Sequence, residues 1–130
     1  MTEPVWLLPD LVRSVHRALL AEHGGAVGLR DAGLLDAALA RPKQRLAYGE
    51  AHSVFDLAAS YSYAIARNHP FVDGNKRVAL TLGAVFLKLN GYTLEAPEPQ
   101  AVVMFRLLAA GDVDEAGLSA WFADHAVKHA

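Results

Sequence analysis

Hydrophobic residues recur at intervals of three and four along most of the chain, the period of an amphipathic helix. Capping and helix-breaking residues divide this pattern into six predicted helices, at about residues 9–23, 32–41, 53–67, 75–89, 99–110 and 114 onwards. The fifth contains the hydrophobic residues Val102, Val103, Phe105, Leu107 and Leu108. Only residues 45–51 and 92–94 are candidates for extended chain. The pattern predicts an all-α bundle whose core is the helix pair 54–67 and 75–89.

Composition narrows the classes of protein that this chain can belong to. Its 130 residues, 53% of them hydrophobic and 20% charged, are typical of one globular domain spanning residues 1–130. The absence of cysteine excludes disulfides and thiolate catalysis. A net charge of −2 gives no reason to expect direct nucleic-acid binding. No signal peptide or membrane-spanning run is evident, so we expect a cytoplasmic protein with no membrane partner.

The loop between the third and fourth predicted helices carries the candidate chemistry. It reads His69-Pro70-Phe71-Val72-Asp73-Gly74-Asn75-Lys76-Arg77. A helix that begins near Gly74 or Asn75 presents free N–H groups and a positive dipole end to an anion. Lys76 and Arg77 add fixed positive charge beside them.

Two further side chains in this loop suggest a reaction. Asp73 is a hard oxygen ligand that suits Mg²⁺ held partly by substrate phosphates, and His69 has the chemistry of a general base. Each also has a structural interpretation, Asp73 as a helix N-cap and His69 as a cation at a helix C-terminus. Pro70 and Phe71 are interpreted as structural residues that anchor the loop. Together these loop residues indicate phosphoryl or nucleotidyl transfer. The alternative is a helix–loop–helix whose polar surface residues have no catalytic role.

The loop resembles the Fic/Doc motif, His-Pro-Phe-x-Asp/Glu-Gly-Asn-Gly/Lys-Arg. Four other stretches are similar to the death-on-curing (Doc) subfamily, namely Gly28-Leu29-Arg30-Asp31 and on to Leu35, Ala38-Leu39-Ala40-Arg41-Pro42, the region of Tyr48, and Phe86-Leu87-Lys88-Leu89-Asn90-Gly91. The resemblance extends from about residue 7 to residue 122. It implies a Fic/Doc-type fold of about six helices with the active loop between the two central ones.

The resemblance also implies a function. It points to a toxin of a type II toxin–antitoxin module, inhibited in trans by a small antitoxin and using ATP and Mg²⁺. His69 would activate the target hydroxyl, Asp73 would bind Mg²⁺, and the segment Gly74, Asn75, Lys76 and Arg77 would hold phosphates. Most Fic proteins transfer AMP to a protein hydroxyl, whereas Doc phosphorylates a threonine of elongation factor Tu and blocks translation.

Two positions favour phosphate transfer over AMP transfer. Lys76 stands where the AMP-transferring motif has glycine, and Leu80 stands where that motif has a second arginine. AMP transfer remains the alternative, because Pro70 and Gly74 match the common Fic motif. A catalytically idle module that only binds its antitoxin is a third possibility.

The segment before the third predicted helix is a candidate for a second part of the site. Leu46, Ala47, Tyr48 and Gly49 stand where Fic proteins place a flap that aligns the target peptide; an ordinary connecting loop is the alternative.

Histidines outside the loop are not assigned to the site. His125 and His129 are four residues apart, but we interpret them as solvated rather than as metal ligands. We expect His16 to be partly exposed and without a role.

Overall fold

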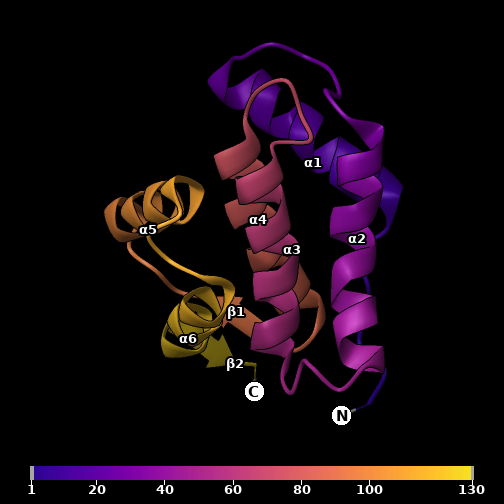
Figure 1. Ribbon diagram of the computed structural model, residues 1–130. Coiled ribbons are helices and arrows are strands. Elements are labelled where there is room, and N and C mark those ends of the chain that lie inside the picture. Colours follow the sequence, from indigo (N-terminus) through magenta and orange to yellow (C-terminus); the bar gives the residue numbers. More distant parts are fainter. Residues whose placement is uncertain (1, 130) are drawn as a thin grey trace.

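The computed structural model describes residues 2–129 and has an all-α architecture with one small β-sheet (Figure 1). The elements in chain order are α1 (Pro9–His23), α2 (Ala32–Ala47), α3 (Val54–Asn68), α4 (Asn75–Leu89), β1 (Tyr92–Leu94), α5 (Glu98–Ala110), α6 (Glu115–His125) and β2 (Ala126–Lys128). The predicted six-helix bundle is confirmed. Helices α3 and α4 form its centre; α2 and α6 pack against α3, and α1 lies across the end of the pair.

Local capping explains where three of the helices begin. Asp31, Ser53 and Asp114 are the N-caps of α2, α3 and α6. Their side-chain oxygens accept hydrogen bonds from N–H groups three residues on, at 3.0, 3.2 and 2.7 Å. Each bond satisfies a donor that has no partner within the helix. These starts were predictable because the signal is entirely local.

The predicted end of the second helix before Pro42 is wrong. Helix α2 continues through Pro42, which is buried, as far as Ala47. Proline lacks the N–H that would bond to the preceding turn. Packing of Pro42 in the core and polar contacts of Arg41 and Arg45 offset that loss.

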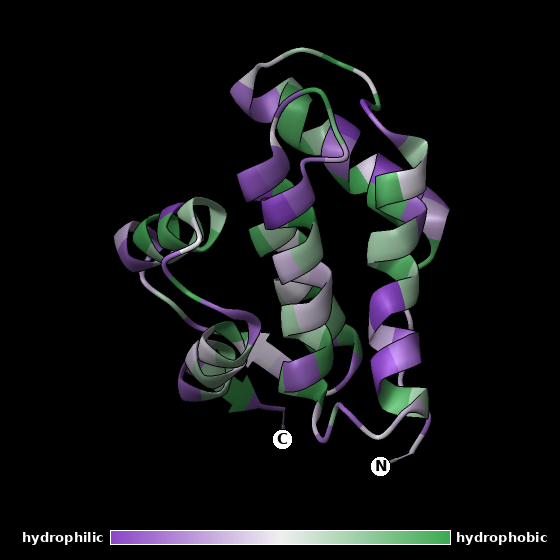
Figure 2. Ribbon diagram, in the orientation of Figure 1, coloured by the Kyte–Doolittle hydropathy of each residue, from purple (hydrophilic) through white to green (hydrophobic). Residues whose placement is uncertain are grey.

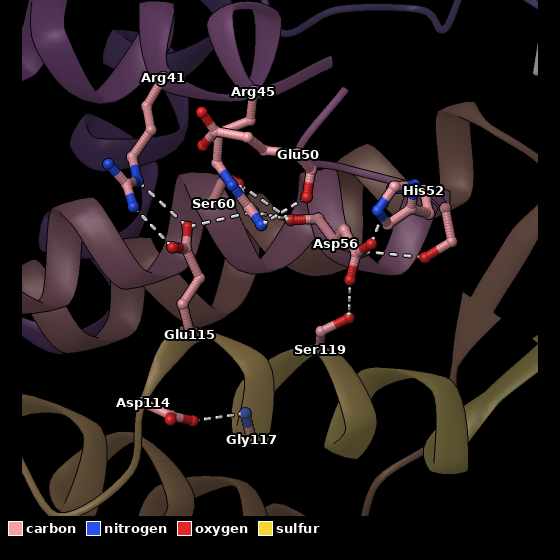
Figure 3. Close-up of polar contacts among 11 residues, drawn as sticks. Arg41, Arg45, Glu50, His52, Asp56, Ser60, Asp114, Glu115, Gly117 and Ser119 are labelled. Carbon is pink, nitrogen blue, oxygen red and sulfur yellow. Dashed lines mark hydrogen bonds and ion pairs between the residues drawn. The ribbon is translucent and has the colours of Figure 1, made fainter. Parts of the chain in front are cut away.

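Those two arginines join α2 to α3 and α6 (Figure 3). Arg41 makes a two-pronged contact with the Glu115 carboxylate at 2.6 and 3.1 Å, and Arg45 lies 3.3 Å from the same group. Arg45 also donates to the Ser60 hydroxyl and to the Asp56 carbonyl. Hydrogen bonding to Glu115 outweighs partial burial and raises the pKa of Arg41. The cluster holds three helices together at their polar edges.

The sixth helix is shorter than predicted. It ends at His125, and residues 126–128 form β2, which pairs antiparallel with β1 so that Thr93 lies opposite Val127. Residues 92–94 are therefore extended, as predicted. The pairing satisfies backbone groups of β1 that would otherwise be unpaired.

The two central helices approach each other closely because small residues line their contact. The Ser62 hydroxyl donates to the Ala79 carbonyl at 2.6 Å. A Cβ on Gly83 would lie 2.5 Å from the Ser62 Oγ and 2.6 Å from the Phe122 ring. Position 83 therefore admits only glycine at the present helix spacing.

Helix α5 (orange in Figure 1) contacts both central helices and has hydrophobic residues on more than one face. Ala101, Phe105 and Leu108 are buried. The other hydrophobic residues of this helix named above, Val102, Val103 and Leu107, are exposed. None of the helices in residues 2–129 is long and apolar enough to cross a membrane.

Candidate functional site

The loop that joins α3 to α4 lies at one end of the bundle, next to α1 and the α1–α2 connection (Figure 1). The ends of α3 and α4 beside this loop are hydrophilic (Figure 2). Phe71 is buried and forms an isolated antiparallel bridge with Leu29, while Val72 N donates to Gly28 O at 3.0 Å. The loop is thus held to the α1–α2 connection, a segment distant from it in the sequence.

Asn75 fixes the shape of the loop from within. Its side-chain oxygen accepts from Phe71 N at 3.0 Å, and its side-chain nitrogen donates to Phe71 O at 2.9 Å. Asn75 is itself buried. The sequence placed Asn75 among the phosphate ligands, and the structure gives its side chain a second task in closing the loop.

His69 caps the C-terminal end of α3 in a left-handed conformation, with φ 51° and ψ 60°. It is the only non-glycine residue with positive φ in the part of the chain that the structure describes. The Arg30 guanidinium contacts this turn: Nε donates to His69 O and Nη2 donates to Asn68 O, both at 2.6 Å. His69 is one of the residues that line the cavity described below.

His16 supports the loop from α1, contrary to our expectation of a partly exposed residue. It is 5% exposed, its ring stacks on Phe71 at 3.9 Å between centroids, and Nε2 lies 3.0 Å from Asp73 O. A carbonyl oxygen only accepts, so Nε2 carries the hydrogen. No sequence pattern indicated this role, because the partners of His16 belong to an element far from α1 in the chain.

The Asp73 carboxylate is held by backbone donors from two segments. Oδ1 accepts from Gly74 N at 2.8 Å, and Oδ2 accepts from Ala26 N at 3.2 Å. Gly25 (φ 123°) leaves room for this carboxylate, because a Cβ there would lie 2.8 Å from Oδ2. The connection between α1 and α2 therefore orients the candidate metal ligand.

The N-terminus of α4 comes directly after Asp73 in the chain. Gly74, at φ 79°, occupies the N-cap position and has no side chain to satisfy the first amides. The first helical bond of α4 runs from Val78 N to Gly74 O at 3.0 Å. The N–H groups of Asn75, Lys76 and Arg77 precede that bond and are the ones a helix offers to an anion.

A cavity of about 460 Å³ opens between this loop and α5. Its polar lining comes mostly from the loop and the start of α4, and its apolar lining includes Leu80 and Phe105. The residues from the predicted site are His69, Asp73, Gly74, Asn75, Lys76 and Arg77. Leu80, which the sequence comparison with the motif singled out, lines it as well. The lining residues that sequence reasoning did not assign are Val72, Ala101, Val102, Phe105 and Arg106.

The charge of the cavity lining is mostly positive. Within residues 2–129, no ion pair neutralises Lys76, Arg77 or Arg106, and Asp73 is the single acidic residue in the lining. Arg106 enters from α5, so only the three-dimensional fold reveals it. The arrangement suits a ligand that is both anionic and partly apolar.

The candidate flap lies elsewhere. Leu46 and Ala47 form the last turn of α2, Tyr48 is its C-cap, and Gly49 follows at φ 73°. This segment precedes the N-terminus of α3, whereas His69 caps the opposite end, about 22 Å away along a 15-residue helix. The structure does not bring the candidate flap to the loop. The segment that lies beside the α3–α4 loop is the α1–α2 connection, residues 24–31.

A metal ion at this site would depend on ligands from the substrate. No cluster of three or more acidic or histidine side chains suited to a metal exists among the described residues. His125 and His129 contact Trp121 O and Thr93 Oγ1 respectively. Asp73 alone fits Mg²⁺, whose coordination is commonly completed by water and phosphate oxygens.

A helical domain whose two central helices are joined by a loop that carries histidine, aspartate and two cations at one cavity is the class that this fold and site define. Residues 6–87 match the Fic/DOC family, and the chain belongs to it. It is 37% identical over 91 residues to the "Protein kinase doc" of Escherichia phage P1, covering 69% of this chain and 72% of that protein. It is 49% identical over 75 residues to the "Toxin Doc" of Mycolicibacterium smegmatis (strain ATCC 700084 / mc(2)155), covering 56% of this chain and 57% of that relative.

Proposed function

We propose that this protein is a toxin of a type II toxin–antitoxin module that transfers phosphate from Mg-ATP to a protein hydroxyl. The observation that carries the proposal is the convergence of His69, Asp73, the α4 N-terminus and three cationic side chains on one cavity. Membership of the Fic/DOC family and the names of the two relatives support it.

The residues present fit a magnesium nucleotide. The N–H groups at positions 75–77 and the cations of Lys76, Arg77 and Arg106 suit phosphate oxygens. Asp73, already oriented by two backbone donors, suits a metal that also takes phosphate ligands. Leu80 and Phe105 offer an apolar wall to the less polar part of the nucleotide.

His69 is the candidate general base. It accepts the proton of the target hydroxyl as that oxygen attacks, and later releases it to water. ATP, when bound, supplies the phosphoryl group and leaves as ADP. The helix N-terminus and the cations stabilise the charge that develops on the transferred group, which is the main task of a protein in phosphoryl transfer.

Two residues favour transfer of the terminal phosphate. Lys76 carries a long cationic side chain where AMP-transferring members of the family have glycine, and it lines the cavity. Leu80, which also lines the cavity, replaces a second phosphate-binding arginine. Both changes disfavour the AMP-transferring pose. AMP transfer is the second candidate, favoured by Pro70 and Gly74, which match the common motif.

The proposed partners are a small antitoxin that inhibits in trans and a protein target, with elongation factor Tu as the first to test. Residues 1–130 do not contain the Ser/Thr-x-x-x-Glu-Gly/Asn inhibitory motif that many Fic proteins carry, which supports inhibition in trans. The target hydroxyl is proposed to be a threonine.

The proposal is tested by treating purified elongation factor Tu with the protein and Mg-ATP, and then supplying it to a cell-free translation reaction. We expect translation to stop after treatment with wild type or with the surface variant Arg17→Ala, and to continue after treatment with His69→Ala or after removal of Mg²⁺ with EDTA. Equal inhibition by wild type and folded His69→Ala would contradict the proposed chemistry.

A further inference from the structure

Arg30 donates hydrogen bonds to the backbone at the start of the loop between α3 and α4. Its guanidinium donates from Nε to His69 O and from Nη2 to Asn68 O, both at 2.6 Å. Its backbone N–H also donates to Pro70 O, at 2.8 Å. One residue of the α1–α2 connection thus binds three consecutive carbonyls where α3 ends and the active loop begins.

The carbonyls concerned are the ones that a helix leaves unsatisfied. Asn68 is the last residue of α3 and His69 is its C-cap. Their oxygens carry the negative end of the helix dipole, and a planar guanidinium can satisfy two of them with parallel, charge-assisted bonds. The C-terminal end of α3 therefore favours an arginine at position 30, because its planar guanidinium is positively charged and offers two parallel N–H donors.

The backbone conformation of His69 determines where its side chain points. His69 has a left-handed backbone, which residues with a Cβ adopt at a cost and only where the surroundings hold them there. A change in its φ and ψ redirects the Cα–Cβ bond. Such a change would move the imidazole relative to the cavity that it lines.

We infer that Arg30 is a positioning residue, which holds the His69 backbone in the conformation that aims the imidazole into the cavity. The inference rests on the proposed role of His69 as the general base. Arg30 does not line the cavity itself, and its contacts with the loop end at Pro70. The phosphate-binding part of the loop, from Gly74 to Arg77, is held separately by Asn75 and by the start of α4.

This separation predicts a distinctive kinetic effect. Removing the guanidinium should slow phosphate transfer and leave nucleotide binding intact. A misplaced catalytic group commonly costs about 100-fold in rate, so we expect a fall of roughly 10- to 100-fold in kcat for Arg30→Gln. The KM for ATP should stay within about twofold of wild type. Arg30→Lys keeps the charge but replaces the fork by a single point donor, so its kcat should lie in between.

The experiment compares wild type with Arg30→Gln, Arg30→Lys and Arg30→Ala. The surface control is Arg17→Ala, because the Arg17 side chain donates only to Ser14 Oγ on its own helix among the described hydrogen bonds. Transfer rate, ATP affinity by calorimetry and melting temperature are measured for each. Millimolar guanidinium ion is then added to Arg30→Ala. We expect it to restore part of the lost rate, and to have no effect on Arg17→Ala.

Two results would overturn the inference: a wild-type transfer rate in folded Arg30→Gln, or a parallel loss of ATP affinity that shows a general collapse of the loop. A second measurement is independent of activity. NMR of the His69 backbone and ring should show increased mobility or altered shifts in Arg30→Gln and wild-type signals in Arg17→Ala. Absence of transfer in wild type would refute the proposed function alone, and unchanged His69 signals in Arg30→Gln would overturn the positioning role alone.

Discussion

Asn75 and Phe71 form a reciprocal pair of hydrogen bonds in which one side chain satisfies both backbone groups of one residue. The pair closes the loop between α3 and α4 and sets the start of α4 directly after Asp73 and Gly74. Both residues are buried, so no water can replace the bonds without rearrangement of the loop.

Replacing Asn75 should therefore destabilise the protein. Asn75→Ala leaves a buried N–H and a buried carbonyl of Phe71 unpaired, at a cost of about 1–3 kcal/mol in the free energy of unfolding. Asn75→Asp should cost at least as much, because it places a carboxylate against Phe71 O. Urea denaturation measures both. The control Lys76→Ala, at an exposed neighbouring position, should stay within about 0.5 kcal/mol of wild type. A similarly small effect for Asn75→Ala would contradict this role.

Gly83 sets the distance between the central helices. Gly83→Ala places a methyl group 2.5 Å from Ser62 Oγ and 2.6 Å from the Phe122 ring, so α4 must shift. Overpacking of this kind costs about 1–3 kcal/mol. Adding Ser62→Ala removes one of the two clashes and should recover part of that loss, which a double-mutant cycle quantifies. An unchanged melting temperature for Gly83→Ala would show that the helix spacing is not fixed there.

Asp56 should contribute to stability in a pH-dependent way. Partial burial raises the pKa of Asp56, but hydrogen bonds from Ser119 and the His52 N–H, together with the Arg45 charge, outweigh burial and lower it below its ordinary value of 3.8 (Figure 3). A folded-state pKa below the unfolded one stabilises the fold above the unfolded pKa, and this stabilisation is lost as the pH falls through the folded pKa.

The variant Asp56→Asn should consequently melt below wild type at about pH 7, and the difference should shrink at about pH 2. Melting temperatures at the two values test this. The exposed Asp112→Asn serves as the control and should show no such trend. If the difference in melting temperature between Asp56→Asn and wild type were the same at both pH values, the charge of Asp56 would not contribute to stability.

Arg106 should bind the phosphates of the nucleotide from the α5 side of the cavity. Because it lines the cavity and no ion pair neutralises it among the described residues, Arg106→Ala should weaken ATP binding by about tenfold. The loss should diminish as salt is raised, since an exposed charge is screened. Calorimetry at two salt concentrations, with Arg17→Ala as the matched control, makes the comparison. Equal affinities for wild type and Arg106→Ala would remove Arg106 from the site.

The parts of the fold that sequence predicted are those with local causes. Ser53 and Asp114 begin helices through bonds to residues three positions away, and such signals are visible in a sequence. Pro42 was misinterpreted because burial and the contacts of its neighbours, not local preference, decide that α2 continues. The strand at residues 126–128 depends on pairing with β1, from which α5 and α6 separate it in the chain.

The candidate site also contains one part that the sequence could predict and one part that it could not. The loop residues from His69 to Arg77 form one contiguous stretch, so their proximity was predictable. His16, Arg30 and Arg106 reach the site or its supporting turn from three other elements. Spacing in the sequence carries no information about such contacts, which depend on how α1, α5 and the α1–α2 connection pack around the loop.

The central claim is transfer of the terminal phosphate of ATP, dependent on His69. It is tested most directly by parallel reactions with γ-labelled and α-labelled ATP on elongation factor Tu and on whole lysate, with His69→Ala as the blank. The account predicts protein-bound label from the γ-position alone, and none with His69→Ala. Label from the α-position alone would identify an AMP transferase and contradict the interpretation of Lys76 and Leu80.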